Sequence, residues 1–340
     1  MKRLFLPLLV LCLLLSGCAG VMQPQKQYTA TFLDLFDTVT TIVGKAESKE
    51  AFQATAQTIH DQLLPYHQLF DIYNGYDGIS NLKTINDNAG LNPVTVDQKI
   101  ISLLLDCKKY HSATGGMVNA AMGSVLKLWH EARNDGIDDP QNAKLPDSGA
   151  LQAAALHTDF DKVVIDEAAR SVFITDPNVR LDVGAIAKGW AVQQIAESAP
   201  QGLLISVGGN VCATGAKDES GTPWVVGIQD PDGSDKYLHT LNITKGSVVT
   251  SGDYQRAYVV QDKLYHHIID PATLYPSEYW RSVTIVCADS GLADALSTAL
   301  FLLPYEEGLA LLQQFDAQAL WVDAAGRRYY SPNFQDLIRT

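Results

Sequence analysis

The chain has 340 residues, of which 46% are apolar and 19% are charged, and its formal net charge is −13. A chain of this size and composition can bury a full hydrophobic core without disulfides, as one large domain or as two closely packed lobes. The negative charge repels polyanions, which argues against nucleic-acid binding.

The N-terminus carries a short targeting signal. Lys2 and Arg3 precede an apolar run that ends in Leu15-Ser16-Gly17-Cys18. This pattern predicts a secretory leader over residues 1–17, and the run is too short to span a membrane comfortably. Small residues directly before Cys18 resemble a bacterial lipobox, so we expect Cys18 to be lipidated. The alternative is a free cysteine in an uncleaved leader. The lipobox interpretation predicts an extracytoplasmic lipoprotein, anchored to the bacterial membrane by a polar tether over residues 18–29.

The folded part is expected to occupy residues 30–340 as one catalytic domain. Its first elements are a strand over Thr31–Val43, a helix over Lys49–Leu64 that ends before Pro65, and a second helix over Val96–His111. The segment Asn134–Pro146 is dense in Asp, Asn, Gly and Pro and predicts a loop.

Strands dominate the second half of the chain. They are predicted over Lys162–Ile165, Ser171–Thr175, Leu203–Val207, Trp224–Gln229, Ser247–Thr250 and Val283–Val286. Several are joined by short Gly/Asp turns and not by crossover helices. This predicts an α+β fold with largely antiparallel sheets.

The cysteines do not indicate a disulfide framework or a metal cluster. Once the leader is removed and Cys18 is lipidated, Cys107, Cys212 and Cys287 remain, an odd number without metal-ligand spacing. We expect all three to be buried in packing.

Two glycine-containing segments can approach a ligand through the backbone. Arg180–Trp190 is predicted to run from a strand into a helix start, where free N–H groups favour an anion and where Asp182 and Lys188 can contact it. A plain strand-turn-helix is the alternative. Leu203–Asn210 ends in a glycine pair that by itself predicts a turn.

A histidine pair lies beside a carboxylate in His266-His267-Ile268-Ile269-Asp270, downstream of Thr250–Tyr254. A histidine next to a carboxylate can transfer protons near neutral pH. Adjacent residues on a strand face opposite sides, so at most one of the two histidines is expected in a site.

The helix predicted over Ser290–Leu303, ended by Pro304, is apolar nearly all round. Asp294 and Thr298 are four residues apart, so their oxygens lie on one face. A carboxylate buried there must be paired or bound to a metal, and such oxygen ligands suit Mg²⁺ or Ca²⁺. The alternative is an Asp stabilised by the helix dipole, with Thr298 bonded back to a carbonyl.

Taken together, five segments in this order resemble the ApbE family of flavin transferases. They are Asp182–Gly189, Ser206–Asn210, Thr250–Tyr254, His267–Thr273 and Ala293–Ala299. The similarity also takes in Phe36-Asp37-Thr38, Thr114–Met117 and Leu128-Trp129, and so covers nearly the whole chain after the tether.

The resemblance implies an ApbE-like fold, with helices flanking the sheets and with FAD and a metal in a central cleft. It implies a Mg²⁺-dependent enzyme that transfers FMN from FAD to a threonine hydroxyl of an acceptor protein and releases AMP. The metal ligands that it implies are Ala185, Asp294, Ser297 and Thr298. The positions that it implies for FAD contact are Phe36, Tyr73, Met117, Val118, Asn119, Asp182, Lys188 and Ile269. His267 and Asp270 are the catalytic candidates.

The chain departs from the family pattern at three places. Phe36 stands where methionine is common, Asn119 where aspartate is usual, and Tyr275-Pro276 where Gly-x-Pro is usual. Two other functions stay open, an FAD pyrophosphatase and a non-catalytic flavin-binding lipoprotein. The resemblance suggests membrane subunits of electron-transfer complexes as the acceptors.

Overall fold

The computed structural model describes residues 25–233 and 236–339. Cys18, the leader and the first part of the tether lie outside the described residues. Residues 26–29, predicted as the end of the tether, are the first residues of a strand. Among the described helices, none is both long and apolar enough to cross a membrane.

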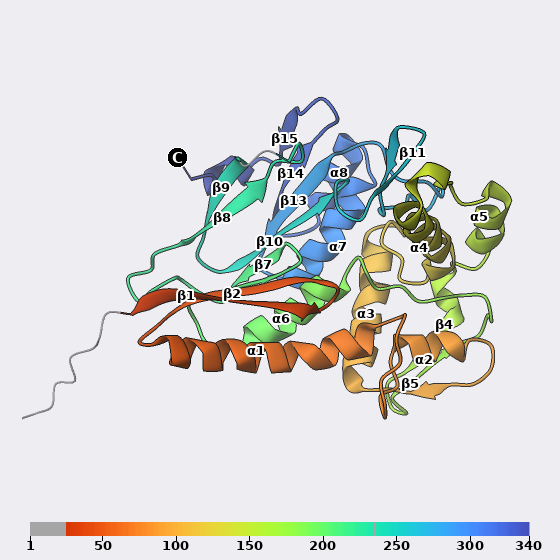
Figure 1. The fold of residues 1–340 in the computed structure, drawn as a ribbon, viewed down its shortest axis with the longest axis horizontal. Helices are drawn as coiled ribbons and strands as arrows, with labels where there is room; N and C mark the ends of the chain where they lie inside the picture. The colour runs from red at the N-terminus through yellow and green to blue at the C-terminus, as the bar shows by residue number, and fades with distance from the viewer. Residues whose placement is uncertain (1–24, 234–235, 340) are drawn as a thin grey trace, which may run out of the picture.

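An eight-stranded sheet organises the fold (Figure 1). Every hydrogen-bonded neighbour in it is antiparallel, which confirms the predicted antiparallel α+β architecture. In spatial order the strands are β1 (Lys26–Leu35), β2 (Thr38–Ala46), β6 (Leu203–Val207), β7 (Asn210–Ala213), β10 (Gly246–Gly252), β13 (Ser282–Cys287), β14 (Ala317–Val322) and β15 (Arg328–Tyr330).

The remaining strands form small sheets of two or three. These are β3 (Val94–Thr95), β5 (Ser171–Ile174) and β4 (Val163–Asp166) in one sheet, β8 (Trp224–Gln229) with β9 (Tyr237–Ile243), and β11 (Tyr258–Val260) with β12 (Lys263–Tyr265). The helices are α1 (Lys49–Phe70), α2 (Leu82–Asp87), α3 (Gln98–Ala113), α4 (Gly123–Asp138), α5 (Ser148–Ala155), α6 (Ala187–Ser198), α7 (Ser290–Phe301) and α8 (Tyr305–Leu312). Short 3₁₀ turns occur at Pro140–Asn142, Phe160–Lys162 and Phe334–Leu337.

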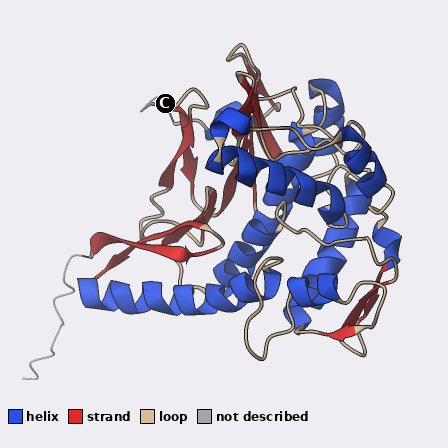
Figure 2. Cartoon of the chain, turned by 45° about the vertical axis from the view of Figure 1, so that its right-hand side comes forward, coloured by secondary structure: helices blue, strands red, loops and turns tan. Residues whose placement is uncertain are grey.

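Three hydrophobic cores hold these layers together. The largest lies between the sheet and helices α1, α3, α6 and α7. The β8–β9 hairpin packs over a second core that includes Trp224, Val248 and Leu320. A third core joins α4 to the β11–β12 hairpin through Trp129 and Tyr258. Figure 2 shows the resulting arrangement of helices around the strands.

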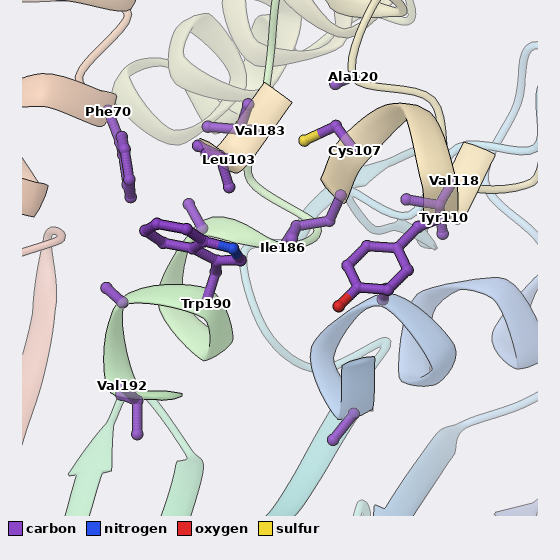
Figure 3. Close-up of a cluster of buried hydrophobic side chains, with 14 of the residues drawn as sticks. Phe70, Leu103, Cys107, Tyr110, Val118, Ala120, Val183, Ile186, Trp190 and Val192 are labelled. Atoms are coloured by element: carbon purple, nitrogen blue, oxygen red, sulfur yellow. The ribbon is translucent and has the colours of Figure 1, made fainter. Parts of the chain in front are cut away.

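Trp190 fixes helix α6 within the largest core, where Figure 3 shows it among side chains from α1 and α3. Its ring centroid lies 5.8 Å from that of Phe70, and its Nε1 donates a hydrogen bond of 2.8 Å to Asp106. The indole is thus both packed and hydrogen-bonded. The start of α6, just before Trp190, therefore has a fixed position.

The prediction of one strand over Thr31–Val43 is wrong, because β1 and β2 form a hairpin. The turn is made by Phe36 and Asp37, whose φ angles are 55° and 50°. Left-handed backbone at two non-glycine residues has no strong sequence signal. The hairpin brings Phe36 and Val39 to the edge of a cavity.

Several helix boundaries also differ from the predictions: α3 spans Gln98–Ala113 and α7 ends at Phe301. Helix α1 continues through Pro65 to Phe70. The proline removes one backbone donor, but the buried side chains of Tyr66, Leu69 and Phe70 continue the apolar face and offset that cost. The predicted loop Asn134–Pro146 is partly helical, since α4 extends to Asp138 and a 3₁₀ turn follows.

Several other predictions are confirmed. Strands β6 and β8 have the predicted bounds, and α7 starts at the predicted residue. Cys107, Cys212 and Cys287 are buried and unpaired. The glycine pair Gly208-Gly209 makes the two-residue turn between β6 and β7, with φ angles of 57° and 90°.

Candidate active site

A cavity of about 660 Å³ opens beside the β1–β2 turn, the start of α6 and one face of α7. Its volume is in the range of cofactor sites. Of the residues predicted for a site in the folded domain, twelve line it: Phe36, Tyr73, Met117, Val118, Asn119, Asp182, Ala185, Lys188, His267, Ile269, Asp294 and Thr298. The fold thus gathers segments that are widely separated in the sequence.

The α6–α7 contact builds one wall of this cavity. A Cβ on Gly189 would collide with the carbonyl oxygen of Ser290 and lie 2.5 Å from the Cβ of Asp294. The absence of a side chain therefore lets the two helices approach closely. This approach allows the Gly189 N–H to donate a hydrogen bond of 2.8 Å to Asp294 Oδ2.

Asp294 is only 4% exposed, which makes its charge costly. Burial raises the pKa of its carboxyl group, while Lys188 and the Gly189 N–H act in the opposite direction. Lys188 Nζ lies 3.9 Å from Asp294 Oδ2 and donates to the Gly184 carbonyl at 3.3 Å. One fixed cation and one backbone donor thus face the carboxylate.

The donor chemistry around Asp294 fits a hard divalent cation. Thr298 lies one helical turn from Asp294, and both line the cavity together with Ala185. Within residues 25–233 and 236–339, no group of three or more His, Cys, Asp or Glu side chains is placed to hold a metal. A cation here would therefore use one carboxylate together with hydroxyl and carbonyl oxygens, which Mg²⁺ accepts.

Ser297 is placed differently from the other implied metal ligands. It is buried and does not line the cavity, and its Oγ hydrogen-bonds to the Asp294 carbonyl and to Ser251 Oγ, each at 2.8 Å. Its side chain therefore joins α7 to the end of β10. Only its carbonyl oxygen, as the resemblance implies, is a candidate ligand.

The start of α6 is preceded by a turn and not by the predicted strand, since Arg180 makes only an isolated parallel bridge with Met122. In the turn, Asp182 Oδ1 accepts a hydrogen bond of 2.9 Å from the Gly184 N–H. Ala185 follows at the lip of the cavity. The backbone at this helix start therefore lies where it can contact a ligand in the cavity, as predicted.

His267 enters the cavity from the segment after β12. Its Nδ1 donates to the Gln255 carbonyl at 3.0 Å, so the neutral ring keeps Nε2 as an acceptor. Burial and the nearby Arg256 lower the pKa of His267 to about 3. The site therefore holds a neutral imidazole with one basic nitrogen.

His266 and Asp270 have structural roles. His266 Nε2 donates to the Ser277 carbonyl at 2.8 Å, and its ring lines a separate cavity of about 300 Å³. This confirms that only one of the two histidines lies in the site, although both follow the strand. Asp270 does not line the main cavity, and its Oδ1 accepts from the Ala272 N–H at 2.7 Å.

The side chain of Asn119, although it borders the cavity, is held by the protein itself. Its Nδ2 donates to the Thr158 carbonyl at 2.8 Å, and its Oδ1 accepts from the Ala121 N–H at 2.9 Å. Only an amide can do both, because an ionised carboxylate has no donor. This accounts for asparagine where the family usually has aspartate.

His130 and Arg256 are among the cavity side chains that sequence reasoning missed. The Nδ1 of His130, on α4, lies 2.5 Å from the Tyr73 hydroxyl oxygen and is hydrogen-bonded to it. Arg256 lies in the loop after β10 with a φ of 46°. The sequence carries no periodic signal for either residue, although His130 directly follows the Leu128-Trp129 pair.

Comparison with known proteins identifies the family of the chain. The sequence profile of the ApbE family matches residues 34–321. An FAD:protein FMN transferase of Treponema pallidum (strain Nichols) is 36% identical over 279 residues, which cover 76% of this chain and 75% of the relative. An FAD:protein FMN transferase of Klebsiella pneumoniae (strain 342) is 32% identical over 277 residues, covering 77% and 83%.

Solved structures give the same result at the level of the fold. The ApbE protein of Thermotoga maritima superposes with a TM-score of 0.80 at 29% identity, covering 93% of this chain and all of the other. The flavin transferase ApbE of Vibrio cholerae has a TM-score of 0.75 at 22% identity. The chain belongs to the ApbE family.

Proposed function

We propose that this chain is a Mg²⁺-dependent FAD:protein FMN transferase, which attaches FMN to a threonine hydroxyl of an acceptor protein and releases AMP. Family membership and relatives that carry this name support the enzyme class. The observation that carries the proposal is a cavity with a neutral histidine, a lysine and a buried carboxylate on one side.

The reaction is a phosphoryl transfer. The threonine oxygen forms a bond to the phosphorus on the FMN side of FAD, the bond from that phosphorus to the bridging oxygen breaks, and AMP leaves. Such reactions depend mainly on positioning and on charge neutralisation. The threonine proton moves to a base in the cavity.

His267 is the base that the geometry supports. The Gln255 carbonyl fixes its Nδ1–H, which leaves the Nε2 lone pair free. A pKa of about 3 makes a weak base, but the negative charge of a bound pyrophosphate favours the protonated ring and raises this pKa. The base therefore gains strength when the substrate is present.

Lys188 and the start of α6 supply positive potential to the pyrophosphate. Lys188 already faces the buried Asp294 carboxylate. Ala185, Asp294, Ser297 and Thr298 would hold Mg²⁺, with the carbonyl oxygens of Ala185 and Ser297 completing the set. Bound there, the ion supplies charge neutralisation at the phosphates.

The test uses the purified full-length chain in detergent, with FAD, Mg²⁺ and an acceptor protein of a membrane electron-transfer complex. We expect the acceptor mass to increase by phosphoester-linked FMN, and the increase to vanish when the acceptor threonine is changed to alanine or when EDTA is added. Free FMN and AMP with an unmodified acceptor would instead identify an FAD pyrophosphatase. An intact FAD pool would identify a flavin-binding lipoprotein.

We also propose that the protein is extracytoplasmic and lipid-anchored through Cys18. The apolar run and the Ser16-Gly17-Cys18 sequence support this location. Cys18→Ala is expected to lose the lipid and to leave the membrane fraction. A variant that still partitions with membrane and keeps its gel mobility would refute the anchor without touching the enzymatic proposal.

A further inference from the structure

His130 joins two walls of the cavity that come from distant parts of the chain. It lies on α4, and its Nδ1 is 2.5 Å from the Tyr73 hydroxyl, in the segment after α1. Its Nε2 is 4.0 Å from Asp182 Oδ2, in the turn before α6. The His130 and Asp182 side chains are 20% and 9% exposed, so these two groups are largely shielded from water.

The chemistry of the neighbours fixes where the protons lie. Burial lowers the pKa of His130, and the charges of Arg133 and Arg256 act in the same direction against the opposing charges of Asp182 and Glu131. The ring is therefore neutral at neutral pH. The Tyr73 hydroxyl donates to Nδ1 across the 2.5 Å contact, which leaves the proton of the neutral ring on Nε2, facing Asp182 at 4.0 Å.

Tyr73 needs such a partner to keep a defined orientation. Its backbone N–H is held by Asp71 Oδ1 at 2.7 Å, but its side chain is 56% exposed. Burial of the phenol and the charge of Asp182 raise the pKa of Tyr73, so the hydroxyl remains a donor. The hydrogen bond to His130 therefore fixes the orientation of the Tyr73 ring and leaves part of its surface exposed to the cavity.

We propose that His130 is a positioning residue that orients Tyr73 and Asp182 to bind a planar ring of FAD. The inference rests on the proposed function and deepens it. An exposed aromatic face held by a hydrogen bond at its hydroxyl favours stacking with a planar ring. FAD offers two such rings, its isoalloxazine and its adenine, and both present polar edges to a group such as Asp182.

The test uses substitutions that separate the contact at His130 Nδ1 from the contact at its Nε2. His130→Asn keeps an amide near the Nδ1 position and so keeps the bond to Tyr73, whereas His130→Gln keeps an amide near the Nε2 position. His130→Ala removes both. Transfer kinetics of the full-length chain in detergent should show a KM for FAD raised about three- to tenfold in His130→Ala, the range for one hydrogen bond, with kcat within about twofold.

A double-mutant cycle with Tyr73→Phe tests the coupling. The rise in KM caused by Tyr73→Phe should largely disappear when His130 is already alanine, because the bond is then already lost. His130→Asn should restore most of the affinity. Competition by riboflavin and by AMP then shows which ring of FAD stacks on Tyr73, the isoalloxazine or the adenine. Only the inhibitor whose ring contacts Tyr73 should bind less tightly to His130→Ala than to the wild type.

His239→Gln is the matched control, because His239 Nε2 bonds to the Tyr330 hydroxyl at 2.8 Å and lies outside the residues that line the cavity. It should leave KM for FAD unchanged. A KM in His130→Ala equal to that of the wild type, or equal losses of kcat in His130→Asn and His130→Ala, would overturn the positioning role. Failure of the wild-type chain to bind FAD at all would instead overturn the proposed function.

Discussion

The two walls of the cavity are held in different ways. The wall formed by α6 and α7 depends on backbone contact, with Gly189 against Ser290 and the Gly189 N–H on Asp294. Another wall, at α4, depends on a side-chain hydrogen bond between Tyr73 and His130. In the proposed reaction, the α6–α7 wall, called the rigid wall below, holds the charges of Lys188 and Asp294 that phosphates and a metal would meet. The wall at α4 would contact a ring of FAD, and contacts with a ring tolerate the adjustment that side chains provide.

Asp294→Ala is expected to have the largest effect, because it removes the single carboxylate of the rigid wall. Mg²⁺-dependent turnover should be abolished, while FAD binding survives at reduced affinity. Asp289→Ala on the same helix is the control, since Asp289 caps α7 through the Leu292 N–H at 2.9 Å. It should lose about 0.5–2 kcal/mol of stability but keep its activity. Full turnover of Asp294→Ala would rule out the metal site.

His267→Gln should lower kcat by about 10²- to 10⁴-fold, the usual contribution of a positioned base. His266→Gln is the adjacent control and should alter stability more than kcat, because its ring bonds to the Ser277 carbonyl. Rates measured under single-turnover conditions, with saturating FAD, check this. Comparable losses in both variants would remove His267 from the chemistry.

The half-buried His267 also predicts a pH dependence of stability. Its pKa falls from 6.5 to about 3 on folding, so the unfolded chain binds more protons between these values. Stability should therefore decrease as the pH is lowered from about 6.5 towards 3. Denaturant unfolding at several pH values should show a smaller decrease in His267→Gln.

Gly189→Ala tests whether backbone contact holds the rigid wall. The added Cβ would force α6 and α7 apart, at a cost of about 1–3 kcal/mol in the free energy of unfolding. Gly308→Ala in α8 is the control, because its Cβ would lie 3.6 Å from Leu300 in ordinary contact. That variant should be as stable as the wild type or more so. Equal stability of the two variants would contradict the close-packing argument.

Asn119→Asp should have the smallest effect. It places a carboxylate against the Thr158 carbonyl and should cost about 1 kcal/mol of stability. Because the Asn119 side chain is already held within the protein, KM for FAD should change by less than about twofold. A gain in FAD affinity would show that the usual family aspartate contacts the ligand here too.

The same contrast explains what could be predicted from the sequence. The α6–α7 wall comes from contiguous motifs, so Asp182, Lys188, Asp294 and Thr298 could be identified before the fold was known. Strand β6 and the start of α7 followed from composition and periodicity.

The remaining features depend on tertiary contacts. The β1–β2 turn uses left-handed Phe36 and Asp37, and α1 passes through Pro65 because its buried face continues. His130 becomes significant only when α4 meets Tyr73, a residue 57 positions earlier. Asp270 was predicted to be catalytic because it lies in the histidine motif. In the structure its carboxylate accepts a hydrogen bond within a local turn.

In the proposed lipid-anchored form, strand β1 is the first described element between the anchor and the cavity. It starts at Lys26 and ends at Leu35, next to Phe36 at the cavity edge. Ten residues of strand span about 33 Å. With Cys18 as the proposed anchor, this length and residues 19–25 together limit how far the cavity can stand above the lipid. Acceptor threonines within roughly this height of the bilayer would be served most readily.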